Sequence, residues 1–156
     1  MIKKIIVLFF SLWVLTGCFA NNMKNNAVNE TWVEEQQLYD ALIEAADKNY
    51  KNYYFIDLRS QTDYNTAFIE GFVNQSRENL QIFLEDASQW DMIILMSEDT
   101  EKTNEAVAYV EGLGFDNVKY VFISLERLFT FFESKNMIME VTPNGDICPI
   151  ENPEGC

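Results

Sequence analysis

The 156-residue sequence contains no histidine, and it has only 11 basic residues against 25 acidic ones. The absence of histidine excludes Ser-His-Asp and Cys-His catalysis, zinc sites of the HExxH kind and proton transfer by imidazole near neutral pH. The net charge of −14 argues against a nucleic-acid partner, because contacts to phosphate need lysine and arginine. No spacing typical of metal ligands is present, and we expect no metal and no cofactor.

Proline and cysteine are also scarce, with three residues of each. All three prolines follow residue 141, and residues 142–156 form a tail with the turn signal Asn144-Gly145. Cys148 and Cys156 lie in this tail. Outside the cytoplasm two such thiols most simply pair, so we expect a structural disulfide between them. A redox-active pair is the alternative, although the spacing is not Cys-x-x-Cys.

The chain nevertheless has the composition of a folded protein. Apolar residues make up 48% of it and aromatic residues 14%. This apolar fraction argues against intrinsic disorder, and the length indicates one domain with a substantial core.

The first 17 residues have the pattern of a secretory signal peptide. Lys3 and Lys4 precede an almost unbroken apolar run over residues 5–16. That run is shorter than the roughly 20 helical residues needed to span a bilayer. An uncleaved anchor or a buried helix is the alternative.

Leu15-Thr16-Gly17-Cys18 resembles the lipobox of bacterial lipoproteins. The resemblance implies that residues 1–17 are removed and that Cys18 becomes a lipidated N-terminus. The alternative is an ordinary cysteine in a signal peptide. Residues 18–30, polar and rich in asparagine, would form a flexible tether. The expected location is then a bacterial cell membrane or envelope, extracytoplasmic, with the lipid bilayer as partner through acylated Cys18.

Short apolar runs and helical patterns alternate along the rest of the chain. Thr31-Trp32-Val33-Glu34 matches a capping box and predicts that a helix begins there. Strands are predicted at residues 53–58, 91–96 and 118–123, and helices at 79–84, 103–113 and 125–133. Gly114 suits the left-handed position after a helix. A strand, a helix and a strand within about 30 residues favour a parallel sheet.

The order of these elements resembles a rhodanese domain over residues 31–141. The resemblance rests on Ile56-Asp57-Leu58-Arg59, on Asp63-Tyr64 and on the segment 69–74, and then on residues 92–97 and 114–118. It implies an α/β fold with a central parallel sheet of about five strands flanked by helices. In that family Asp57 and Arg59 would be structural residues near the site, and we expect them to form an ion pair at a strand end.

The resemblance fails at the position of the catalytic cysteine. A rhodanese loop of type C-R-x-G-x-R carries a cysteine that accepts sulfur as a persulfide. The matching loop here is Ser97-Glu98-Asp99-Thr100-Glu101-Lys102. A serine hydroxyl cannot form a persulfide, and no histidine is present to activate it. Lys102 matches the second arginine of the family, so one positive charge is retained.

The acidic loop also opposes an anionic substrate. Glu98, Asp99 and Glu101 would repel an anion, whereas acidic residues at a helix N-terminus stabilise the helix dipole. Binding of a cation at this loop is an alternative that no ligand spacing supports. Ile123-Ser124 replaces the Gly-Gly pair that usually follows the last strand of the family, which further argues against catalysis.

Three functions remain open. The first is a membrane-tethered rhodanese-like lipoprotein that lacks sulfurtransferase activity and acts as a binding or scaffolding module, with an unidentified protein or small-molecule partner. The second is a thiol-disulfide or sulfur-handling enzyme that uses Cys148 and Cys156. The third is a structural envelope lipoprotein without a ligand. A cleft beside Ser97 that is filled by Phe68 or Phe72 would favour the third function, and an open cleft the first.

Overall fold

A five-stranded parallel sheet forms the centre of the fold in the computed structural model, which describes residues 32–150. The strand order is β1-β6-β5-β2-β4, and all neighbours are parallel. The strands are β1 (Trp32–Val33), β2 (Tyr53–Asp57), β4 (Phe72–Asn74), β5 (Met92–Met96) and β6 (Val118–Val121). The prediction of an α/β fold with about five parallel strands flanked by helices is confirmed.

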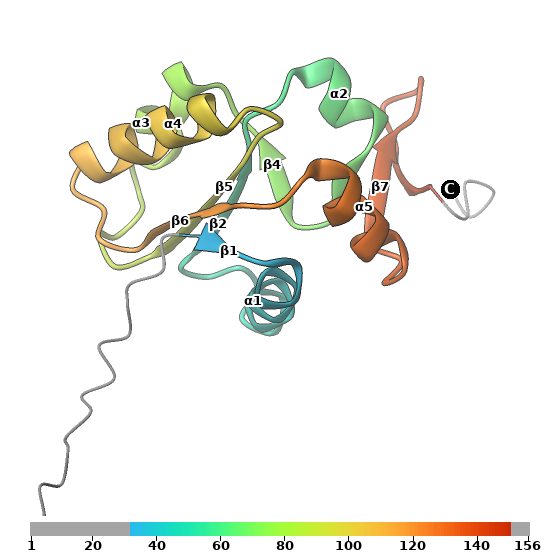
Figure 1. Ribbon diagram of the computed structural model, residues 1–156, viewed down its shortest axis with the longest axis horizontal. Coiled ribbons are helices and arrows are strands. Elements are labelled where there is room, and N and C mark those ends of the chain that lie inside the picture. Colours follow the sequence, from blue (N-terminus) through green and yellow to red (C-terminus); the bar gives the residue numbers. More distant parts are fainter. Residues whose placement is uncertain (1–31, 151–156) are drawn as a thin grey trace, which may run out of the picture.

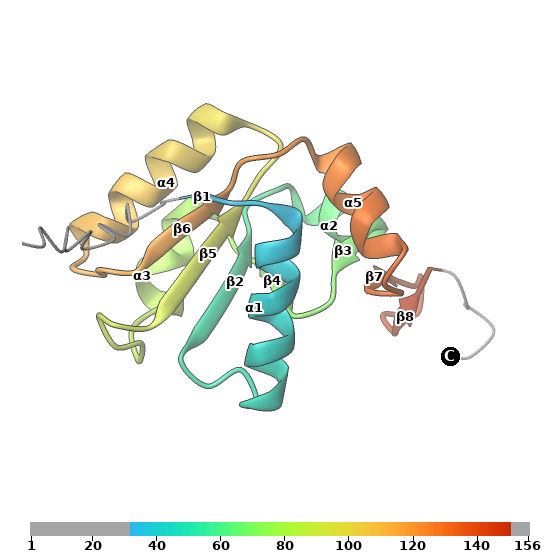
Figure 2. The same cartoon turned by 60° about the horizontal axis from the view of Figure 1, so that its bottom comes forward.

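Helices cover both faces of this sheet, as Figures 1 and 2 show. The described helices are α1 (Glu35–Asp47), α2 (Gln61–Thr66), the 3₁₀ helix η1 (Arg77–Asn79), α3 (Leu80–Phe83), α4 (Thr100–Gly112) and α5 (Leu125–Glu133). Successive strand residues point to opposite faces. Phe55 and Ile94 therefore join the core beneath α1 and α5, while Ile56 and Leu95 join the core beneath α3 and α4.

A second, antiparallel sheet was not predicted. Its order is β3-β7-β8, from β3 (Phe68–Ile69), β7 (Ile138–Val141) and β8 (Ile147–Pro149). Gly145, at φ +89°, lies in the turn between β7 and β8, where the Asn144-Gly145 signal indicates a turn. This sheet continues across the boundary predicted between residues 141 and 142, so the first part of the tail pairs with the preceding domain.

The first helix begins later than its capping box predicted. Thr31 lies outside the described residues. Trp32 and Val33 form β1, which pairs with Tyr120 and Val121 on the side of β6 that faces away from β5. Glu34 is the N-cap, and its backbone N–H donates to Gln37 Oε1 at 2.9 Å. The capping box is therefore present but shifted by three residues, because the sheet edge takes the preceding backbone into a strand.

Other predicted elements are confirmed. Helix α5 spans residues 125–133 as expected, and Gly114 adopts φ +99° immediately after Leu113, the C-cap of α4. The signal peptide, Cys18, the tether and Cys156 lie outside the described residues, so those predictions stay open. Within residues 32–150, none of the helices combines the length and the apolar character needed to cross a bilayer.

Candidate functional site

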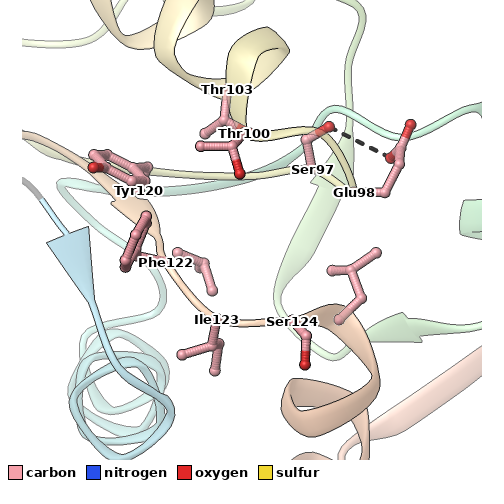
Figure 3. A pocket seen from close by; sticks show the side chains of 10 residues that line it. Ser97, Glu98, Thr100, Thr103, Tyr120, Phe122, Ile123 and Ser124 are labelled. Atoms are coloured by element: carbon pink, nitrogen blue, oxygen red, sulfur yellow. Dashed lines mark hydrogen bonds between the residues drawn. The ribbon is translucent and has the colours of Figure 1, made fainter.

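An open cavity of about 260 Å³ lies at the carboxyl ends of β5 and β6. Ligands commonly bind at this edge of parallel sheets, because the loops that follow neighbouring strands meet there. Figure 3 shows Ser97 and Glu98 on one side, with Phe122, Ile123 and Ser124 opposite them. The ten lining residues are Ser97, Glu98, Thr100, Thr103, Tyr120, Val121, Phe122, Ile123, Ser124 and Leu125.

Ser97 is the first residue after β5, and its hydroxyl is held by its own loop. The backbone N–H of Asp99 donates to Ser97 Oγ at 3.2 Å. The Ser97 hydroxyl lies 3.4 Å from Glu98 Oε2, the contact drawn in Figure 3. Both neighbours come from the same three-residue turn, and Glu98 is the only ionisable side chain that lines the cavity other than Tyr120.

The loop that carries Ser97 is shorter than the six residues predicted. Helix α4 begins at Thr100, so Thr100, Glu101 and Lys102 form its first turn. Asp99 causes this early start. Its Oδ1 accepts the backbone N–H groups of Glu101 at 2.8 Å and Lys102 at 3.2 Å. An N-cap aspartate of this kind stabilises a helix by about 1 kcal/mol.

The charge around the cavity is negative. Glu98 is the only charged side chain among the lining residues. Lys102, the predicted remaining cation, does not line the cavity. Its Nζ lies 3.9 Å from Glu98 Oε1, and the side chain borders a separate polar hollow together with Arg77. An anion in the cavity would therefore face the Glu98 carboxylate, whereas the cation paired with Glu98 does not line the cavity.

Asp57 and Arg59 form the ion pair that the sequence predicts. Arg59 Nη2 lies 2.6 Å from Asp57 Oδ2, and Arg59 Nε lies 3.1 Å from Oδ1. Arg59 also donates to the carbonyl of Ala67 at 2.7 Å, and its Cζ lies 4.8 Å from the centroid of the Phe129 ring. Neither residue lines the cavity beside Ser97. The pair connects the end of β2 to the loop before β3 and to α5.

The aromatic residues expected to fill the cleft lie elsewhere. Phe68 and Phe72 line a different groove beside β2 and β4, so the cavity at Ser97 is open. Tyr120 and Phe122, which do wall the cavity, were not predicted as site residues. The parallel order of β5 and β6 is the signal that identifies them, since it brings residues 120–125 beside Ser97.

The remaining predicted residues do not join this site. Cys148 is fully buried in β8 and disulfide-bonded. Because Cys156 lies outside the described residues, its pairing with Cys148 stays a prediction. No group of three or more potential metal ligands comes together within residues 32–150.

Comparison with known proteins finds structural but not sequence relatives. No family model matches the chain, and no curated protein does so either. The rhodanese-like domain of an Anabaena protein superposes with a TM-score of 0.54 at 18% identity, over 75% of this chain and 87% of that one. A Bacillus halodurans protein gives 0.54 at 16% identity, over 78% of each chain.

A thiosulfate sulfurtransferase from Pseudomonas aeruginosa also superposes, with a TM-score of 0.53 at 10% identity. The match covers 70% of this chain but only 20% of that enzyme. Structural similarity at such low sequence identity supports the fold but no specific activity or role. With its parallel sheet, its two helical layers and these neighbours, the chain has the rhodanese-like α/β fold.

Proposed function

We propose that this chain is a rhodanese-like binding module without sulfurtransferase activity, tethered by lipid to the extracytoplasmic side of a bacterial membrane. The proposed absence of activity rests on the turn that follows β5. By the sequence resemblance to rhodaneses, Ser97 matches the position of the catalytic cysteine, and the Asp99 carboxylate accepts the helix N–H groups behind it.

The chemistry of this turn opposes sulfur transfer in two ways. A persulfide needs a thiolate, and Ser97 offers only a hydroxyl, whose oxygen cannot carry sulfane sulfur as a persulfide. A helix N-terminus attracts an anion when its N–H groups are free. In α4 the N–H groups of Glu101 and Lys102 already donate to Asp99, which supplies the negative charge from within the chain.

The open cavity favours a binding role over a purely structural one. A wall of hydroxyl and aromatic side chains surrounds a volume of about 260 Å³, and the side chains expected to fill it lie elsewhere. The thiol-disulfide alternative gains no support, because the sulfur of Cys148 is fully buried and an exchange reaction needs access to it.

The first test is a sulfurtransferase assay with thiosulfate or mercaptopyruvate as donor and cyanide as acceptor. We expect no turnover above background from the wild-type protein. Ser97→Cys should also remain inactive, because the thiol would still face Glu98 and a helix terminus occupied by Asp99. The Pseudomonas aeruginosa thiosulfate sulfurtransferase serves as the positive control. Wild-type turnover that is lost in Ser97→Ala would contradict the proposal.

The second test concerns the tether. When the full chain is expressed in a bacterium that processes lipoproteins, we expect it in the membrane fraction, with an intact mass that lacks residues 1–17 and gains a diacylglyceryl group at Cys18. The matched variant Cys18→Ala should lose the lipid mass and leave the membrane fraction. An unmodified Cys18 in the membrane-extracted protein would refute lipid anchoring while leaving the assay result unaffected.

A further inference from the structure

A second hollow lies beside β2 and β4, and none of its lining residues lines the cavity at Ser97. This aromatic groove has a volume of about 590 Å³. Eight of its thirteen lining residues are tyrosine or phenylalanine. The lining residues are Tyr50, Tyr53, Tyr54, Phe55, Tyr64, Phe68, Glu70, Gly71, Phe72, Val73, Phe83, Met139 and Ile147. Sites for small ligands are commonly concave and of this size.

The groove exists because the edge strand β4 is shorter than β2. Phe72 is the first residue of β4, and it pairs with Phe55. Tyr53 and Tyr54, the first two residues of β2, therefore have no partner on the β4 side. Residues from β7 and the start of β8, namely Met139 and Ile147, line the groove as well. It thus lies where the parallel sheet ends and the second sheet begins.

The rings of the groove are fixed by contacts with one another. Tyr64 stacks on Phe68 with 4.3 Å between ring centroids, and its hydroxyl donates to the carbonyl of Phe72 at 2.8 Å. The rings of Tyr53 and Phe55 are stacked, with 6.2 Å between their centroids. Burial and the nearby carboxylate of Asp57 raise the pKa of Tyr64 to about 12, with Arg59 acting in the opposite direction. The phenol therefore stays neutral over the physiological range.

Glu70 is the only acidic or basic side chain that lines the groove. None of the ion pairs among residues 32–150 involves it. Glu70 lines the groove together with Tyr50, and burial, followed by the charge of Glu70, raises the pKa of the Tyr50 phenol. The groove thus joins aromatic faces to one carboxylate without a countercharge.

A cation already lies against one of these rings. Lys48 Nζ is 5.4 Å from the centroid of Tyr53, although Lys48 does not itself line the groove. The negative face of an aromatic ring attracts ammonium groups, most strongly when they are weakly hydrated. Lys48 is held there by Glu44 on α1.

The segment that presents Tyr50 is held in a costly conformation. Asn49, Tyr50 and Asn52 have φ values of 51°, 55° and 67°, in the left-handed region. For a bulky residue such as tyrosine this conformation is rare, and strained residues of this kind concentrate at functional sites. The Tyr50 N–H donates to Ala45 O at 2.7 Å, which holds the turn against the end of α1.

Gly71 makes room for the Tyr50 ring. A Cβ at this position would lie 2.9 Å from Tyr50 Cε1 and 2.9 Å from Leu42 Cδ2. The backbone of Gly71, at φ +91°, is also in a conformation that favours glycine. The groove therefore depends on one strained tyrosine and on the glycine beneath it.

We propose that the aromatic groove binds a small, free organic cation that carries a methylated ammonium group. The rings would surround the methyl groups, and Glu70 would face the charge. An anion would meet Glu70 and the net charge of −14, and a neutral apolar ligand would bury Glu70 without a partner. This site is separate from the cavity at Ser97, and the inference does not depend on the proposed function.

The test compares choline with its neutral isostere 3,3-dimethylbutan-1-ol by NMR titration of the tyrosine and phenylalanine ring signals. We expect choline to shift the signals of groove residues and to bind about tenfold more tightly than the isostere, as a desolvated cation–π contact implies. Glu70→Gln should weaken choline binding at least about fivefold. The matched control is Glu111→Gln on α4, which should leave the affinity unchanged.

Three results would overturn the proposal. The isostere binding as tightly as choline would show a merely apolar groove, suited to another kind of partner. Unchanged choline affinity in Glu70→Gln would remove the role of the carboxylate. Choline shifts that are absent, or that map to Tyr120 and Phe122, would place no cation site in the groove. Glu70 is exposed, so its substitution tests binding without endangering the fold.

Discussion

Arg59→Ala is expected to lower the free energy of unfolding by about 3–5 kcal/mol, because it leaves Asp57 charged and buried without its partner. The Asp57 side chain is fully buried, and that of Arg59 is only 8% exposed. The substitution also removes the hydrogen bond to Ala67 O and the contact with Phe129. Each of these losses acts on the same loop between β2 and β3.

Urea unfolding followed by circular dichroism measures this effect. The matched control is Lys48→Ala, which breaks the ion pair of Lys48 with Glu44. The Lys48 and Glu44 side chains are 52% and 57% exposed, so we expect little change in the free energy of unfolding. Similar losses for the two variants would show that the Asp57–Arg59 pair does not organise the loop.

Phe132→Ala is expected to destabilise the protein by about 3–5 kcal/mol through the cavity that it creates. Phe132 is fully buried in α5, with its ring 6.3 Å from that of Tyr39 on α1 and 5.3 Å from that of Phe131. It therefore joins the two helices that cover one face of the parallel sheet.

The same substitution at an exposed position supplies the comparison. Phe122 is 58% exposed on the wall of the Ser97 cavity, and Phe122→Ala should cost less than about 1 kcal/mol. Thermal unfolding of both variants measures the difference. A Phe122→Ala loss that equals the Phe132→Ala loss would mean that the cavity wall, and not the interface between α1 and α5, limits stability.

The long elements of the fold were predictable, and the short ones were not. Strands β2, β5 and β6 appear in the sequence as apolar runs, because they are buried on both faces of a parallel sheet. Strand β1 has two residues, and its pairing with β6 depends on a segment 88 positions away along the chain. No local pattern in the sequence reflects such a contact, and the capping-box pattern predicts a helix at Trp32 and Val33 instead.

Of the features of the candidate sites, some could be predicted from the sequence and others could not. The Asp57–Arg59 pair could be predicted, because both residues lie at one strand end. The sequence does not predict the early start of α4, although Asp99 is a favourable N-cap, because the resemblance places residues 97–102 in a loop. The aromatic groove was missed because its walls come from five separate parts of the chain, and only the register of β2 with β4 leaves it open.

The pairing of β3 with β7 has a consequence for the order in which the chain takes shape during synthesis. Residues up to Val121 contain all five strands of the parallel sheet. Phe68 of β3, in contrast, pairs with Met139 of β7, which lies later in the chain. Because the chain is made from its N-terminus, β7 is synthesised only after the last strand of the parallel sheet. Met139 and Ile147 both line the aromatic groove, so a nascent chain acquires its central sheet before it acquires that groove.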